Sequence, residues 1–283
     1  MTSRLTVPEQ LMHATVRIEC TGSGGVKSWG TGFFYKFLDD GKSHVPVIVT
    51  NKHVIRGAAK GAIWLTLRGN DDLPAVGSHH GIEMVPFESM WIQHPEPDVD
   101  LAVIPVASLL TQAAAAGHKY FYVSLDKSLL PSSETIDSFS GFDEILMVGY
   151  PNALWDSVNN LPILRSGVTA THPKYNYEGK PVFLIDCACF PGSSGSPVIV
   201  YDKNGWMDRK GNIYMGQQRV LLVGVLFAGP QHIAEGEIAR IEVPDLAERA
   251  LAISRIPNNL GFVIKSEKLN DFEPILKARM GAA

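Results

Sequence analysis

Cysteine is scarce in this chain of 283 residues, which contains only Cys20, Cys187 and Cys189. An odd number of cysteines cannot form a complete disulfide framework. Cys187 and Cys189 stand two positions apart on an expected strand, so they point the same way and are poorly placed to bridge. We therefore expect three reduced thiols, which is typical of the cytoplasm.

A charge of one sign and long apolar runs are also missing. The formal net charge is -4, so nothing indicates a general nucleic-acid partner or an anionic membrane surface. No apolar run approaches the length of a membrane span. Charged residues such as Arg4, Glu9 and Arg17 interrupt residues 1–20, which predicts no secretory leader. These absences favour a cytoplasmic protein with no membrane partner.

Glycine and proline, by contrast, are plentiful, with 26 and 18 residues placed largely between short apolar runs. This pattern is typical of an all-β protein. Apolar or alternating segments predict two sets of about six strands, separated by turns and by a polar loop over 69–81. The strands are expected at 14–20, 29–35, 45–50, 63–68, 84–87, 90–93 and 101–106, and at 144–148, 163–169, 182–187, 198–201, 219–227 and 261–264.

Changes in composition divide the chain into five predicted segments. They are a polar N-terminal arm (1–11), a first β-barrel (12–106), a linker with a short helix (107–140), a second β-barrel (141–265) and a C-terminal helix (266–283). The second barrel carries an insertion at 230–260, in which helical spacing predicts a helix over 245–254. Pro274 predicts a break in the C-terminal helix.

The segment from Phe190 to Val198 reads Phe-Pro-Gly-Ser-Ser-Gly-Ser-Pro-Val and lies between two apolar runs. Its glycines and prolines predict a tight turn between strands, with Ser194 presented at the tip. A serine hydroxyl becomes a nucleophile when a base takes its proton and a carboxylate orients that base. His53 directly follows the buried strand 45–50, and Asp100 directly precedes the buried strand 101–106. We therefore predict a His53–Asp100–Ser194 site in the cleft between the barrels.

Competing interpretations of the same residues are weaker. Asp98 is the other acidic candidate, but it reads as a solvated loop carboxylate. The Gly-x-Ser-x-Gly elbow of lipases is not met, because Ser196 stands at its last position. His79 and His80 lie in a polar loop without the spacing of a metal site, so neither a metal nor a cofactor is expected.

Four short blocks carry a resemblance to a known family. Thr50-Asn51-Lys52-His53-Val54, Asp100-Leu101-Ala102-Val103, the turn 191–197 and Gly261-Phe262-Val263-Ile264 occur in order. In these blocks the chain resembles the chymotrypsin/trypsin-like serine endopeptidases, above all the disulfide-poor bacterial branch with the Deg-type and glutamyl endopeptidases. The matches run from about residue 12 to 265. The resemblance implies two perpendicular six-stranded antiparallel barrels and hydrolysis of peptide bonds.

The resemblance also implies roles for individual residues. Ser194 would be the nucleophile, His53 the general base and Asp100 the residue that orients it. The backbone N–H groups of Gly192 and Ser194 would form the oxyanion hole. Ser193 stands where secreted members have an aspartate that pairs with a freed N-terminus, so activation by such cleavage is not expected. Competence would come from the fold, or from an activating partner protein.

The same comparison implies an apolar substrate pocket. Its walls would come from residues without charge, namely Ala188, Cys189, Phe190, Leu226, Phe227, Ala228, Gly229 and Gly261. Burying an unpaired charge among them would be costly, so we expect cleavage after a small or medium apolar residue of a protein or peptide substrate. The alternatives are a latent or regulatory protein of the same fold that binds a partner and needs an effector, and an esterase or acyltransferase.

Overall fold

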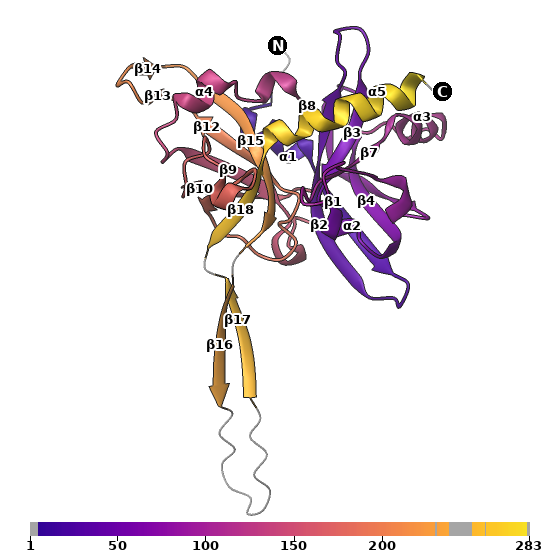
Figure 1. The fold of residues 1–283 in the computed structure, drawn as a ribbon. Helices are drawn as coiled ribbons and strands as arrows, with labels where there is room; N and C mark the ends of the chain where they lie inside the picture. The colour runs from indigo at the N-terminus through magenta and orange to yellow at the C-terminus, as the bar shows by residue number, and fades with distance from the viewer. Residues whose placement is uncertain (1–4, 230, 238–250, 258, 282–283) are drawn as a thin grey trace, which may run out of the picture.

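The computed structural model describes residues 5–229, 231–237, 251–257 and 259–281, with the backbone alone for 231–237 and 251–257. The described chain is dominated by β-strands, as the sequence predicted. Figure 1 shows two β-rich halves side by side, the first in indigo and purple and the second from magenta to yellow.

The first half forms an open, mostly antiparallel sheet of eight strands in the order β5-β4-β1-β2-β3-β7-β6, with β8 parallel to β2. Its strands are β1 (Thr15–Gly22), β2 (Lys27–Phe37), β3 (Val45–Thr50), β4 (Ala58–Arg68), β5 (Pro74–Met84), β6 (Ile92–Gln93), β7 (Ala102–Pro105) and β8 (Leu125–Asp126). The predicted closure into a six-stranded barrel is not confirmed, because β5 and β6 lie at the two ends of the sheet and do not pair with each other. Most of the loop predicted at 69–81 is instead strand β5. Pairing with β4 overrides its polar composition, and its largely exposed side chains offer little apolar face for closure.

The second half closes into a barrel of six strands in the order β10-β11-β18-β15-β12-β9. These strands are β9 (Glu144–Gly149), β10 (Ile163–Thr169), β11 (Val182–Asp186), β12 (Pro197–Asp202), β15 (Arg219–Ala228) and β18 (Leu260–Lys265). All six lie where the sequence predicted strands. Two further pairs are separate from the barrel, β13 (Gly205–Met207) with β14 (Ile213–Met215), and β16 (Gln231–Glu237) with β17 (Leu251–Pro257).

Helices fill the connections. The α-helices are α1 (Val7–Ala14), α2 (Lys52–Ile55), α3 (Ala107–Ala115), α4 (Ser133–Asp137) and α5 (Glu273–Gly281). The 3-10 segments are η1 (Glu88–Met90), η2 (Lys127–Leu129), η3 (Pro151–Ala153), η4 (Tyr177–Gly179) and η5 (Ser266–Phe272). None of the helices within the described ranges is both long and apolar enough to cross a membrane.

The structure corrects two predictions about the helical parts of the chain and agrees with a third. Residues 7–11 of the predicted arm belong to α1, which Thr6 and Glu9 begin as a capping box. The helix predicted over 245–254 is wrong for 251–254, which lie in β17, whose isoleucines favour a strand; residues 245–250 lie outside the described residues. The C-terminal helix is divided as Pro274 suggested. η5 ends at Phe272, and Pro274 occupies the first turn of α5, where its missing N–H is not needed.

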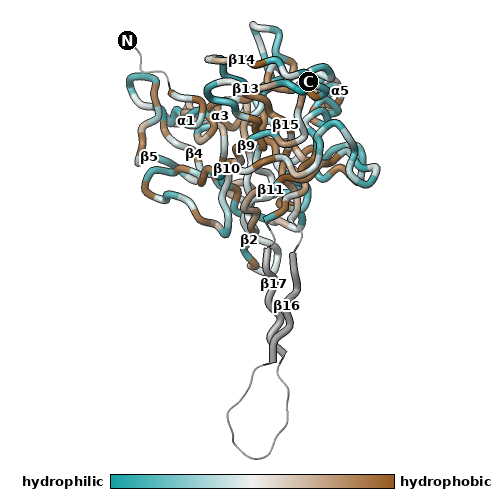
Figure 2. The backbone as a smooth tube through the Cα atoms, turned by 90° about the vertical axis from the view of Figure 1, so that its left-hand side faces the viewer, coloured by the Kyte–Doolittle hydropathy of each residue, from teal (hydrophilic) through white to brown (hydrophobic). Residues whose placement is uncertain are grey.

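The main core is shared by the two halves. Phe33 and Val49 of the first sheet pack in one buried cluster with Ile199 and Val225 of the barrel. Phe272 of η5 belongs to the same cluster, and Figure 1 shows the C-terminal segment running from the barrel over the first half. Figure 2 shows the hydrophobic segments concentrated in the interior of the body, with hydrophilic loops around it. Because the halves share this core, the five-segment division stays a prediction.

Candidate active site

His53 and Asp100 lie in direct contact. β3 ends at Thr50, and the short helix α2 then carries His53 toward the loop before β7. The Nδ1 atom of His53 is 2.5 Å from Oδ2 of Asp100, and the backbone N–H of His53 donates to Oδ1 of the same carboxylate at 3.0 Å. A carboxylate can only accept, so Nδ1 carries the proton and Nε2 is left to accept one. Asp98, the rejected alternative, is exposed.

Two neighbours of His53 hold the loop that carries Asp100. The fully buried Asn51 donates from Nδ2 to the carbonyl of Asp100 at 2.7 Å. The ammonium of Lys52, itself nearly buried, donates to the carbonyl of Glu96 at 2.8 Å. No role was predicted for these residues from the sequence, although both stand in the block that contains His53. Their position directly before the histidine was the available signal.

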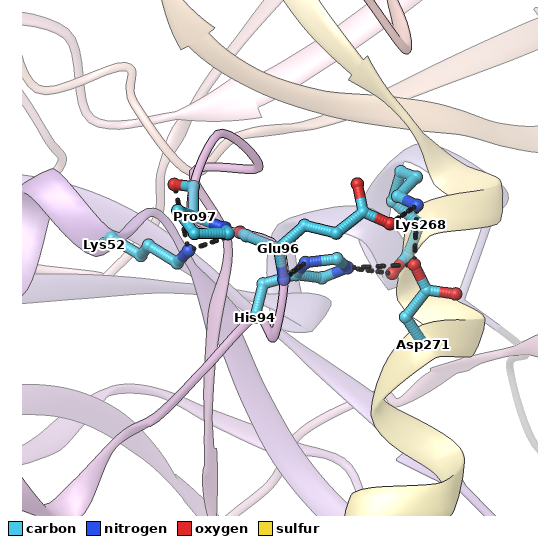
Figure 3. A network of polar contacts seen from close by, with 6 residues as sticks. All are labelled: Lys52, His94, Glu96, Pro97, Lys268 and Asp271. Carbon is cyan, nitrogen blue, oxygen red and sulfur yellow. Dashed lines mark hydrogen bonds and ion pairs between the residues drawn. The ribbon is translucent and has the colours of Figure 1, made fainter.

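A polar network ties this loop to the C-terminal segment (Figure 3). The buried ring of His94 contacts Oδ2 of Asp271 at 3.1 Å and the carbonyl of Lys268 at 3.2 Å through Nε2. Its Nδ1 accepts the backbone N–H of Glu96 at 3.1 Å, so the neutral ring is the form that satisfies both nitrogens. Burial lowers the pKa of His94 and favours this neutral form.

Ser194 lies in the tight connection between β11 and β12, as predicted. Its carbonyl accepts the N–H of Thr31 on β2 at 2.9 Å, and the N–H of Gly195 donates to the carbonyl of Leu226 on β15 at 2.8 Å. The hydroxyl of Thr31 also donates to the carbonyl of Gly192 at 2.8 Å. The turn is therefore held by both halves of the molecule. Sequence reasoning missed Thr31, whose signal was its place between Gly30 and Gly32 in a strand, a sign of close approach.

Both glycines of the turn are required by its geometry. Gly192 and Gly195 have φ angles of 87° and 88°, which L side chains rarely adopt. A Cβ on Gly192 would also lie 2.5 Å from the carbonyl oxygen of Tyr150, and one on Gly195 would overlap the carbonyl of Thr31. Among the described residues, neither the N–H of Gly192 nor that of Ser194 has a hydrogen-bond acceptor. Both donors are therefore free to bind a ligand.

The hydroxyl of Ser194 donates to the carbonyl of Phe227 at 3.4 Å. Within the described ranges it has no hydrogen bond to His53. The two residues nevertheless line one cavity of about 330 Å³, together with residues from both halves: Ser28, Trp29, Val54, Cys189, Phe190, Pro191, Gly192, Leu226, Ala228 and Gly229. Catalytic hydrogen bonds are often long or misaligned without substrate, so this arrangement is compatible with a nucleophile and its base.

Five of the eight predicted pocket residues line this cavity, and Ala188, Phe227 and Gly261 do not. A Cβ on Gly261 would lie 2.6 Å from Sγ of Cys189 and 2.7 Å from Cδ1 of Leu226, so these side chains occupy the space that glycine leaves. Gly261 therefore leaves no open space in the pocket. Burial raises the pKa of Cys189 to about 12, which keeps its thiol protonated.

Comparison with known proteins identifies the family. The model of the trypsin-like peptidase domain matches residues 30–205, a span that includes His53, Asp100 and Ser194. This chain belongs to the trypsin-like peptidase family. Membership supports serine protease activity, and it agrees with an all-β chymotrypsin-like fold that has a closed six-stranded barrel and a C-terminal helix.

No curated protein matches this trypsin-like peptidase. Among solved structures it is similar to the HtrA-type protease AlgW with a tripeptide, at a TM-score of 0.43 and 16% identity over 93% of this chain and 61% of that one. It is also similar to the Rv3671c protease from M. tuberculosis. The active form matches at a TM-score of 0.41 and 15% identity, over 92% of this chain and 79% of that one. The inactive form matches at the same TM-score and identity, over 94% of this chain and 90% of that one. The chain thus spans about three fifths of the length of AlgW, and we draw nothing further from these structures.

Proposed function

We propose that this peptidase is a serine endopeptidase that works through an acyl-enzyme, with Ser194 as nucleophile, His53 as general base and then acid, and Asp100 as the orienting carboxylate. The observation that carries the proposal is the cavity shared by Ser194 and His53, with His53 held by both oxygens of Asp100. The order His, Asp, Ser along the chain agrees with the family.

The mechanism follows from which atoms are free. In this mechanism the Ser194 hydroxyl leaves the Phe227 carbonyl, which it contacts at 3.4 Å, and turns toward the unprotonated Nε2 of His53 across the cavity that both residues line. His53 takes the proton as Oγ attacks the scissile carbonyl, and Asp100 stabilises the imidazolium. His53 then protonates the leaving amine, and an activated water hydrolyses the acyl-enzyme.

The oxyanion would bind to the N–H groups of Gly192 and Ser194. Neither donor has an acceptor in the described part of the chain, and both point from one turn that Thr31 braces. Such prepositioned donors act most strongly on the charge that develops in the transition state, and one of them is worth about 10²–10³ in rate.

The substrate pocket remains apolar in this proposal. Cys189, Leu226 and Ala228 supply apolar lining, and Cys189 together with Leu226 reduces its depth beside Gly261. A small or medium apolar residue before the cut fits a shallow pocket of this kind. The edge of β15 near Phe227 would pair with the backbone of an extended protein or peptide substrate.

Digestion of a peptide library tests both activity and preference. Wild-type protein should cut after residues such as Ala, Val or Leu, and Ser194→Ala should cut nothing. Asp98→Asn is the matched control, because this exposed carboxylate belongs to the same loop as Asp100 without contacting His53. Cuts after Glu or Asp would contradict the apolar pocket, and equal activity of Ser194→Ala would contradict the mechanism.

One observation favours a second candidate, a latent protease that needs an activating partner. The hydroxyl of Ser194 is bonded to the carbonyl of Phe227 rather than to His53. A latent enzyme would cleave the library only after a partner or effector peptide is added, whereas the first candidate cleaves it alone.

The predicted cytoplasmic location is consistent with three free cysteines, and cell fractionation tests it.

A further inference from the structure

The guanidinium of Arg165 is hydrogen-bonded to the segment that carries Ser194. Ser193 is almost completely buried, at 1% exposure. Its hydroxyl oxygen accepts Nη1 of Arg165 at 2.7 Å and the N–H of Phe190 at 3.4 Å. The same Nη1 donates to the carbonyl of Ala188 at 2.8 Å. Arg165 therefore contacts the nucleophile segment at two points, one before and one within the turn.

The other guanidinium nitrogens of Arg165 have no partners among the described residues. Nε and Nη2 are buried without an acceptor, and no carboxylate of the described ranges forms an ion pair with this side chain. Burial lowers the pKa of Arg165, yet a guanidinium keeps its charge throughout the pH range of proteins. Arg165 is thus a partly desolvated cation whose hydrogen bonds all go to the segment 188–193.

Arg219 provides a contrast within the same barrel. It is also buried, but its guanidinium donates to Asp202 at 2.6 Å and to Asp143 at 3.3 Å. An arginine that serves stability alone is expected to be neutralised in this way, because a buried charge with unpaired donors is costly. In the part of the chain that the structure describes, Arg165 lacks such neutralisation, and its guanidinium donates only to the carbonyl of Ala188 and the hydroxyl of Ser193.

We propose that Arg165 is a positioning residue, a built-in cation that orders residues 188–194 so that the N–H groups of Gly192 and Ser194 stay presented. The inference rests on the proposed function. Ser193 cannot form an ion pair with a freed N-terminus, and Arg165 supplies a permanent cation at that residue instead. A free α-amino group loses its charge near pH 8, whereas a guanidinium does not. The active arrangement of this turn then requires no cleavage at the N-terminus.

Two substitutions of Arg165 test the proposal, and Arg219→Met is the matched control. Arg165→Met should lower kcat on the order of 10- to 100-fold with KM little changed, because the oxyanion donors act in the transition state. Arg165→Lys should restore much of the rate at neutral pH and lose it at alkaline pH, because desolvation lowers the pKa of a buried ammonium. The wild type should show no such alkaline loss. Arg219→Met should lower stability but leave the kcat of the folded protein unchanged.

Amide hydrogen exchange separates this inference from the proposed function. Arg165→Met should speed exchange in residues 188–195 of the folded protein, and Arg219→Met should not. If wild-type protein cleaves nothing but Arg165→Met loosens these amides, the proposed function is at fault and the positioning role stands. Three results would overturn the role of Arg165. They are amide exchange in residues 188–195 that does not change in Arg165→Met, a kcat that does not change in Arg165→Met, or a kcat of Arg165→Lys that exceeds that of Arg165→Met at no pH.

Discussion

Among single residues, the proposed mechanism depends first on which carboxylate orients His53. Asp100 accepts from both the ring and the backbone of His53, whereas Asp98 is exposed. Asparagine at position 100 would place an amide against Nδ1 and favour the wrong tautomer. We expect Asp100→Asn to lower kcat by about 10⁴-fold, measured as hydrolysis of a peptide ester or amide. Asp98→Asn should keep the wild-type rate, and the reverse pattern would move the carboxylate role to Asp98.

Thr31 is the residue through which β2 braces the turn that carries Ser194. Its hydroxyl donates to the carbonyl of Gly192 and accepts the N–H of Tyr150 at 3.1 Å. Thr31→Val keeps the shape and leaves both groups unpaired, so the free energy of unfolding should fall by about 1–3 kcal/mol. The kcat should fall as well, because the Gly192 peptide loses a restraint. Urea denaturation and hydrolysis rates measure the two effects.

The same change at Thr111 is the control for Thr31. The Thr111 hydroxyl bonds to Ala107 on the exposed surface of α3, where water replaces a lost hydrogen bond. Thr111→Val should therefore alter neither the free energy of unfolding nor kcat appreciably. Equal effects at Thr31 and Thr111 would mean that the brace contributes nothing specific.

At the scale of elements, the C-terminal segment joins the two halves. Phe272 at the end of η5 is fully buried, with its ring 6.2 Å from Phe37 and 5.3 Å from His94 between centroids. We expect Phe272→Ala to lower the free energy of unfolding by about 3–5 kcal/mol, because it leaves a cavity in the shared core. Met280→Ala, at an exposed position on α5, should change it little. A tolerated Phe272→Ala would show that this segment does not join the halves.

Elements whose apolar pattern was strong could be predicted from the sequence. Most of the six barrel strands carry apolar runs, and glycines and prolines mark the turn with Ser194; the strands and the turn lie as expected. β5 was missed because its residues are polar and only pairing with β4 makes it a strand. The contacts of Thr31 and Arg165 join residues far apart in the chain, so a local pattern could not name their partners. The glycines on either side of Thr31 indicated only that another backbone segment lies close to it.

Across the whole molecule, histidines that are buried or half-buried make stability depend on pH. Burial lowers the pKa values of His13, His94 and His172 below the usual value near 6.5. As pH falls below about 6.5, the unfolded chain takes up protons that the folded protein does not, so stability declines. We expect the midpoint of urea denaturation to fall between pH 7 and pH 5.5. His94→Gln should weaken this dependence, and a midpoint that rises on acidification would contradict the burial of neutral rings.

The central claim is that Ser194 is an activated nucleophile in a protein that needs no cleavage of its own chain. Reaction with a fluorophosphonate probe, followed by mass spectrometry of the labelled peptide, tests it most directly. We expect labelling of the uncleaved wild-type protein at Ser194 alone, no labelling of Ser194→Ala, and strongly slowed labelling of His53→Ala. A wild-type protein that stays unlabelled under every condition, or a label that persists in Ser194→Ala, would contradict it.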